Sequence, residues 1–243
     1  MIDQAKTIEF GLMPTLPYSI EEAVNRLRIN VSFLGSDVRK IMVISSEPNE
    51  GKSFVALNLW SQMAEAGEKV LLVDADMRNS TMYDSYQLRH GDGSEIKGIS
   101  HYLSGNAELV EVLGHTAYGQ GDLLPNTENT VNPSMMLESS KFSELMDEVA
   151  KTYRYVFIDA PPLGLVSDGE RLGSFCDGAI LCVRSEVTPK AVVKNSVRQL
   201  ERSGCPLLGI VLNRVNESKG KYGKYGKYGY GGYYGKYYGT GDK

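Results

Sequence analysis

Apolar runs of strand length alternate with segments of helical periodicity along most of the chain. The runs KIMVISS, KVLLVDAD, YRYVFIDAPP, DGAILCVRS and PLLGIVLNR occupy residues 40–46, 69–76, 153–162, 177–185 and 206–214. Each is apolar nearly throughout, which is typical of strands that are buried on both faces of a parallel sheet. Helical patterns lie around and between them, at about residues 20–34, 53–66, 95–104, 141–152, 168–175 and 189–203. This order predicts a doubly wound, mostly parallel α/β sheet.

Two segments fall outside the alternation. Residues from about 77 to 135 are rich in Gly, Asn and Ser, and the apolar pattern stops after Asn213. The length of 243 residues fits a single α/β domain with a tail. We expect an N-terminal extension at 1–17, one domain at 18–216, and a tail at 217–243. The tail should be disordered alone, because it cannot offset its ordering entropy by burial.

Charge distinguishes the tail from the rest of the chain. Six lysines and two acidic residues give residues 217–243 a net charge of +4, so the remainder carries −8 and the total is −4. An acidic body argues against nucleic acid as a partner. No apolar stretch approaches 18 residues and no secretory pattern opens the chain, so we expect a cytoplasmic protein. The three cysteines lack metal-ligand spacing and are expected to be reduced structural thiols.

The segment SSEPNEGKS lies between a predicted strand and a predicted helix, which is the context of a phosphate-binding loop. Backbone N–H groups and the helix N-terminus attract phosphate there. Lys52 would bridge the β and γ phosphates of ATP, and the Ser53 hydroxyl would bind Mg²⁺. The usual first glycine of the motif is Ser46, so the loop alone leaves an ordinary connection as the alternative. The expected nucleotide-binding residues of the loop are Pro48, Asn49, Glu50, Gly51, Lys52, Ser53 and Phe54.

Two more predicted strands end in acidic residues. VLLVDADMR ends with Asp74 and Asp76, whose alternate positions project to the same side of an extended chain, and YVFIDAPP ends with Asp159. Ligands of doubly wound sheets bind at the carboxyl ends of the strands, so all three acids are expected to converge on Lys52 and Ser53. For any one of these aspartates, the alternative to a role at the phosphate site is that it caps a helix or stabilises a turn.

These motifs and the tail resemble the bacterial tyrosine kinases, the cytoplasmic kinases of capsule and exopolysaccharide systems. That family carries a phosphate loop, a D-x-D-x-R motif after an apolar strand, a third acidic strand and a C-terminal tyrosine cluster. This chain has SSEPNEGKS, LLVDADMR, VFIDAPP and the tail in that order, and the resemblance covers residues from about 18 to the end. It implies a P-loop NTPase domain, similar to the partitioning ATPases, with ATP- and Mg²⁺-dependent protein-tyrosine kinase activity.

The resemblance also implies roles for single residues. Asp74 becomes the base that accepts the proton of the tyrosine hydroxyl, and Asp76 and Asp159 hold Mg²⁺ together with Ser53. Related ATPases contact the nucleotide base at the end of the last strand. Asn213 and Arg214 are therefore expected beside adenine, with a simple turn as the alternative.

The tail is the implied substrate. A flexible segment of about 15 residues spans roughly 20 Å, enough to wander over the expected ATP edge or to reach an adjacent protomer. The family suggests transfer to a neighbouring subunit within a ring. The tyrosines expected to be phosphorylated are Tyr222, Tyr225, Tyr228, Tyr230, Tyr233, Tyr234, Tyr237 and Tyr238.

An assembly motif E-x-x-R-x-x-R is implied for the first helix. Glu22 and Arg28 match it, while the middle arginine is replaced by Asn25 and is followed by Arg26. Glu22, Arg26 and Arg28 are therefore the expected residues of an oligomer interface. The alternative is a helix that is merely amphipathic and capped by Ser19 and Glu22 in a capping box.

Further partners follow from the resemblance. They are a membrane-anchored polysaccharide co-polymerase, which activates the kinase and recruits it to the inner face of the membrane, and a phosphotyrosine phosphatase. Two competing functions stay open: a partitioning or division-site ATPase without kinase activity, and a scaffold whose Tyr-Gly tail self-associates. Glu47 disfavours the first, because that class has a signature lysine at this position of the loop.

Overall fold

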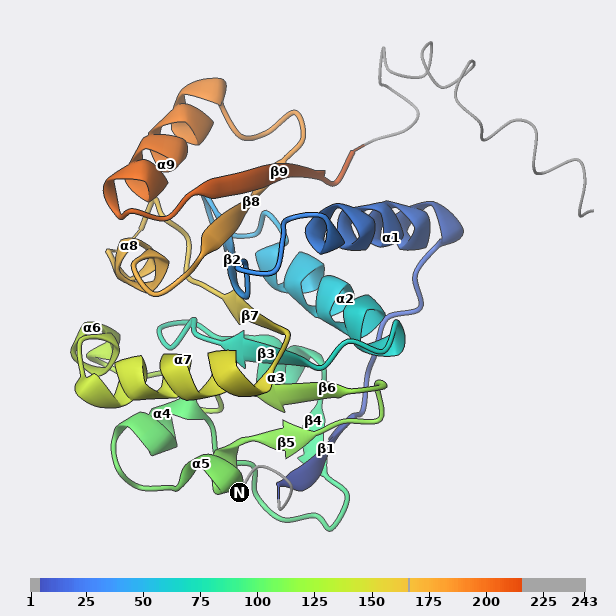
Figure 1. Ribbon diagram of the computed structural model, residues 1–243, viewed down its shortest axis with the longest axis vertical. Coiled ribbons are helices and arrows are strands. Elements are labelled where there is room, and N and C mark those ends of the chain that lie inside the picture. The colour runs from blue at the N-terminus through green and yellow to red at the C-terminus, as the bar shows by residue number, and fades with distance from the viewer. Residues whose placement is uncertain (1–4, 166, 216–243) are drawn as a thin grey trace, which may run out of the picture.

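The computed structural model describes residues 5–165 and 167–215. In this part of the chain, nine strands form one sheet in the order β4-β1-β5-β6-β3-β7-β2-β8-β9 (Figure 1). From β6 to β9 all neighbouring strands are parallel, whereas β5 runs antiparallel to β6 and β4 antiparallel to β1. The predicted mostly parallel α/β sheet is confirmed. The strands are β1 (Lys6–Phe10), β2 (Lys40–Ser45), β3 (Val70–Asp74), β4 (Leu88–His90), β5 (Gly114–His115), β6 (Gly121–Leu124), β7 (Tyr155–Asp159), β8 (Gly178–Arg184) and β9 (Leu207–Asn213).

Helices cover both faces of the sheet. α1 and α2 lie on one face, and α7, α8 and α9 lie on the other (Figure 1). The helices are α1 (Tyr18–Ser32), α2 (Lys52–Glu65), α3 (Met82–Ser85), α4 (Ile99–Leu103), α5 (Leu109–Val112), α6 (Pro133–Leu137), α7 (Ser140–Thr152), α8 (Asp168–Gly173) and α9 (Lys190–Arg202).

The apolar strands are explained by this two-sided cover. In β2, Met42 and Ile44 belong to the core on the α7 side, while Ile41 and Val43 belong to the core on the α2 side. All four are fully buried. Successive side chains of a strand point to opposite faces, so a strand that is buried on both faces must be apolar at every position.

The structure contains elements that the sequence pattern does not predict. These are the strands β1, β4, β5 and β6 and the short helices α3, α5 and α6. They have two to five residues each, too few to establish a period. β1 lies within the expected N-terminal extension, yet it pairs with both β4 and β5.

The strand order places the candidate site at one edge of the sheet. β2, which leads into the phosphate loop, lies between β7 and β8, and β3 lies on the other side of β7. Asp74 and Asp159 are direct register partners at the ends of β3 and β7. The parallel arrangement therefore brings both acidic strand ends next to the loop, as the sequence predicts.

Candidate functional site

The phosphate loop connects β2 to α2 and turns sharply at its end. Gly51 precedes the helix with φ 91°, and Asn49 has φ 62°, both in the left-handed region that few residues adopt readily. At Gly51 a Cβ atom would lie 2.1 Å from Nδ2 of Asn213, so any other residue would be strained at this φ and would displace the Asn213 amide. Because α2 begins at Lys52, the positive end of its dipole faces the loop.

Lys52 lies between the acidic strand ends. Its Nζ is 3.0 Å from Oδ2 of Asp76 and 3.7 Å from Oδ1 of Asp159. It also lies 3.3 Å from the Ser53 hydroxyl. Burial alone lowers the pKa of Lys52, but Asp159 and Asp76 outweigh this effect and raise it above its ordinary value. Lys52 is therefore a fixed positive charge that two carboxylates share.

Asp74 is 1% exposed and accepts hydrogen bonds from the Ser80 hydroxyl and from the backbone N–H of Asp76. Burial, reinforced by the nearby charge of Asp159, raises its pKa to about 8, against the opposing hydrogen bond from Ser80. A carboxyl group whose pKa lies near neutral pH is suited to taking up a proton at that pH.

The acidic residues fit a magnesium ion of the P-loop type. In the described part of the chain, no group of three or more His, Cys, Asp or Glu is arranged to hold a metal. Mg²⁺ in nucleotide sites needs only one or two carboxylates, because phosphates and water supply the other ligands. Oδ1 of Asp159 is buried without a hydrogen-bond partner among the described residues, and burial raises the pKa of Asp159 despite the nearby Lys52. The set of Ser53, Asp76 and Asp159 is thus compatible with the ion.

Two adjoining cavities flank the loop. One of about 400 Å³ is lined by Lys52, Ser53 and Asp76 and also by Pro48, Asn49, Gly51, Phe54 and Arg214. A second, of about 650 Å³, lies between α1, the start of α2 and the end of β9, and it is mainly apolar. Gly51, Phe54 and Arg214 line both. The two cavities form a polar and an apolar compartment side by side, a combination suited to the phosphates and the base of a nucleotide.

Glu50 and Asn213 make contacts that the sequence does not reveal. The side chain of Glu50 is 2% exposed and accepts hydrogen bonds from the backbone N–H groups of Ser46 and Glu47. Asn213 Nδ2 donates to the Glu50 carbonyl at 2.8 Å, and its Oδ1 accepts from the Arg214 N–H. Both amide atoms of Asn213 are therefore engaged within the protein, which leaves Arg214 and Phe54 as the freer candidates for contacting adenine.

Arg78, the arginine of the D-x-D-x-R motif, forms an ion pair with Asp168 at the start of α8. Asp168 is 2% exposed and also accepts from the Ser134 hydroxyl at 2.7 Å. The loop after β3 is thereby tied to α6 and α8. Residues 90 positions apart form this pair, so no local pattern could have indicated it.

Replacing Arg78 should lower stability moderately. Arg78→Met leaves the buried Asp168 without its counter-charge, which for a fully buried pair costs about 3–5 kcal/mol. Because the Arg78 side chain is 36% exposed, we expect only about 1–2 kcal/mol, or roughly 3–6 °C in Tm. Thermal unfolding followed by circular dichroism measures this. Arg89→Met, which removes the exposed pair with Glu9, is the control and should change Tm by about 2 °C at most. Equal shifts for the two variants would contradict the structural role of Arg78.

The expected assembly residues lie on α1. Arg28 donates to Asn25 Oδ1 through Nε at 3.1 Å and Nη2 at 2.9 Å. Asn25, which stands at the position of the middle arginine of the motif, therefore orients Arg28, the last arginine. The capping box of Ser19 and Glu22, which belonged to the alternative, is not formed, because α1 begins at Tyr18, its N-cap residue is Pro17, and no side chain caps it. An oligomer interface with Glu22, Arg26 and Arg28 stays a prediction.

The eight tail tyrosines lie outside the described residues. The chain leaves β9 at Asn213, and Arg214 lines the cavity of Lys52 and Asp76. Arg214, three positions before the tail begins at residue 217, therefore lies at the candidate site. No helix in the described ranges is both long enough and apolar enough to cross a bilayer.

Comparison with known proteins gives consistent matches. The family described as AAA domain matches residues 38–172, more than half of the chain. A tyrosine-protein kinase, CpsD of Streptococcus agalactiae, is 36% identical over 202 residues, which are 83% of this chain and 86% of CpsD.

Two solved structures extend the comparison. The chimerical protein CapA2B2 superposes with a TM-score of 0.74 at 32% identity, covering 84% of this chain and 87% of its own. The septum site-determining protein MinD of Pyrococcus horikoshii, complexed with Mg-ADP, superposes with a TM-score of 0.63 at 25% identity, covering 74% and 72%.

Proposed function

The chain belongs to the bacterial tyrosine kinases, and from this premise we propose that it transfers the γ-phosphoryl group of ATP to the tyrosines of its own C-terminal tail. Transfer takes place in trans between subunits, and it regulates the synthesis and export of a capsule or exopolysaccharide. The observation that supports this most directly is the meeting of Lys52, Asp74, Asp76 and Asp159 at the edge where β9 releases the tail.

Nucleotide binding is assigned to the loop and the two cavities. Lys52 and the N-terminus of α2 hold the phosphates, and the apolar compartment with Phe54 and Arg214 receives the base. Ser53, Asp76 and Asp159 would hold Mg²⁺, which when bound neutralises charge on the phosphates. The MinD neighbour, solved with Mg-ADP, supports this assignment.

Asp74 then acts as the general base. A tyrosine hydroxyl has a pKa near 10 and is a weak nucleophile at neutral pH, so a carboxylate that accepts its proton assists the attack. The hydrogen bond that the Ser80 hydroxyl donates to Asp74 supports this role, because the tyrosine would donate from the same kind of group. The incoming tyrosine would take the place of Ser80 as donor.

The direct test is to incubate the purified protein with Mg-ATP and count phosphates on residues 217–243 by mass spectrometry. Reactions with and without the cytoplasmic segment of the candidate membrane activator test the expected partner. We expect several phosphotyrosines on the tail. ATP hydrolysis without phosphotyrosine under both conditions would favour the alternative, an ATPase of the partitioning type.

Phosphorylation should loosen the oligomer. The tail carries +4 and the rest of the chain −8, so unmodified tails are attracted to neighbouring subunits. Each phosphotyrosine adds about −1.5 to −2 charges, so two or three cancel the positive charge of the tail. Sedimentation velocity before and after full phosphorylation should show a smaller species. Treatment with a phosphotyrosine phosphatase is the control and should restore the larger one, whereas an unchanged or larger assembly after phosphorylation would contradict the switch.

A further inference from the structure

The carboxylate of Glu50 is bound by donors that do not line the phosphate cavity, and Glu50 itself is not among the residues that line it. Its Oε2 accepts from the N–H groups of Ser46 at 2.7 Å and Glu47 at 2.9 Å. Its Oε1 accepts from the Thr188 hydroxyl and from the Arg184 N–H at 3.3 Å. None of the ion pairs among the described residues involves Glu50. A negative charge that is 2% exposed is thus held by neutral donors alone.

This arrangement is unexpected in a loop that binds anions. A buried carboxylate is costly unless hydrogen bonds compensate for lost water, and it repels phosphates nearby. Four donors compensate Glu50, two from the loop itself and two from the end of β8 and the turn that follows it. Hydrogen bonds to an ionised group are stronger than neutral ones, so the contacts fix the loop firmly.

The contacts of Glu50 belong to a hydrogen-bond network that links the ends of β2, β8 and β9. Arg184 ends β8, and the N–H of Ser185, next in the chain, donates to the Asn213 carbonyl at 2.9 Å at the end of β9. Asn213 Nδ2 in turn donates a hydrogen bond to the Glu50 carbonyl at 2.8 Å. The loop after β2 is therefore bound to β8 by the Glu50 side chain and to β9 by its backbone.

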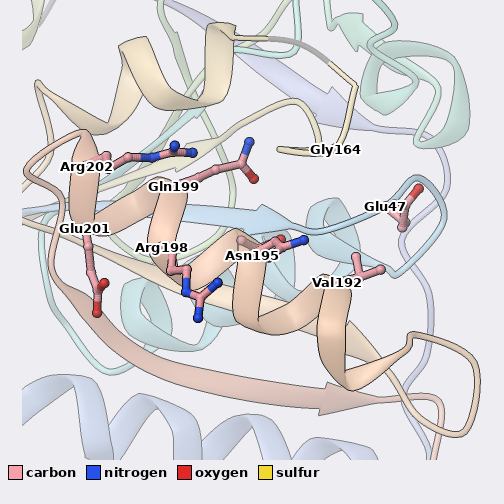
Figure 2. A pocket seen from close by; sticks show the side chains of 9 residues that line it. Glu47, Gly164, Val192, Asn195, Arg198, Gln199, Glu201 and Arg202 are labelled. Atoms are coloured by element: carbon pink, nitrogen blue, oxygen red, sulfur yellow. The ribbon is translucent and has the colours of Figure 1, made fainter.

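Helix α9 adds a further contact to the same loop. The Ser196 hydroxyl donates to Ser46 Oγ at 2.8 Å. A groove of about 810 Å³ runs along α9, and Figure 2 shows Glu47 at one end of it and Arg202 at the other. The Glu47 side chain is exposed on the loop, unlike that of Glu50. The two adjacent acidic residues thus differ in burial and can be compared by mutation.

We propose that Glu50 is a positioning residue of the nucleotide site and that Thr188 is its partner. The carboxylate occupies the first two N–H groups of the loop, and this holds the following turn, with Asn49 and Gly51 at positive φ, in the form that receives phosphate. The inference rests on the proposed nucleotide site. It does not depend on whether the phosphoryl acceptor is a tyrosine.

Titration of the full-length protein with a fluorescent ADP analogue and Mg²⁺ tests the proposal. Glu50→Ala should weaken binding roughly 10- to 100-fold, the effect of losing charge-assisted hydrogen bonds. Thr188→Val removes one donor without changing the size of the side chain and should weaken binding roughly 3- to 10-fold. Thr188→Ser keeps the hydroxyl and should bind like the wild type. Glu47→Gln removes a neighbouring exposed charge and should stay within about twofold.

All titrations are made well below the Tm of each variant in the absence of nucleotide, so that loss of folding does not mimic loss of affinity. Wild-type affinity in Glu50→Ala would overturn the proposal. If that variant does not fold, equal affinities of Thr188→Val and Thr188→Ser would overturn it instead. The two proposals can fail separately. If the Glu50 and Thr188 variants lose ADP affinity as expected but the wild-type protein forms no phosphotyrosine, the kinase proposal is refuted and the role of Glu50 is supported.

Discussion

Lys52→Met should abolish ATP-dependent phosphorylation of the tail. Lys52 is the only basic side chain within 4 Å of Asp76 and Asp159 in the described ranges, and it lies at the N-terminus of α2, where the phosphates are expected. Without it, Asp76 and Asp159 would face the phosphates with no basic side chain within 4 Å of either carboxylate among the described residues. Loss of one group that stabilises the transition state typically costs a factor of about 10²–10³, and loss of a full charge should reach at least that.

Anti-phosphotyrosine blotting and mass spectrometry after incubation with Mg-ATP measure the effect. Lys97→Met is a matched control, because Lys97 pairs with Glu111 on the surface and is distant from the loop in the sequence. It should phosphorylate its tail at the wild-type rate. Robust labelling of Lys52→Met in a folded protein would show that Lys52 is not needed for transfer. It would also contradict the assignment of this loop as the phosphate-binding loop of the kinase.

Asp74→Asn should separate nucleotide binding from transfer. The amide is close in size to the carboxylate and can still accept from Ser80, so the affinity for ADP should change by less than about threefold. It cannot take up the proton of a tyrosine, so the rate of transfer should fall by a factor of about 10²–10⁴. Asp84→Asn, the same change on the exposed side of α3, is the control and should be neutral.

The pH dependence gives a second measure of Asp74. A base must be deprotonated to act, so kcat/KM rises with pH up to the pKa of the free enzyme and then levels off. Because burial raises the pKa of Asp74 to about 8, that rise should extend through neutral pH instead of ending near pH 4. Asp74→Asn should flatten the profile. A wild-type rate that is already constant above pH 5 would exclude Asp74 as the base.

The main sheet could be predicted from sequence because its strands are long and apolar throughout. β2, β3, β7, β8 and β9 each lie within one predicted apolar run. The rule that parallel strands present their carboxyl ends at one edge then brought Asp74, Asp76 and Asp159 to Lys52, as the structure confirms. β5, with only Gly114 and His115, carries no such signal.

Contacts between distant segments could not be predicted. From the sequence, Glu50 is expected to contribute only its backbone N–H to the phosphate loop. The structure shows in addition that its side chain contacts Thr188, 138 positions away. Arg78 belongs to the D-x-D-x-R motif, but the spacing of this motif does not predict an ion pair with Asp168, 90 positions further on. Such pairs depend on which loops the strand order brings together, and a local period carries no information about that order.

The place of β1 in the sheet has a consequence for truncated forms of the protein. A chain that starts at Tyr18 lacks Phe10, whose ring lies 5.9 Å from that of Trp60 and 5.5 Å from that of Tyr118. It also lacks the strand that pairs with β4 and β5, so both would gain an open backbone edge. Open edges beside newly bared aromatic rings promote aggregation. Recombinant forms intended for crystallisation or kinetics should therefore retain Lys6–Phe10, although these residues precede the phosphate loop and the acidic strand ends in the sequence.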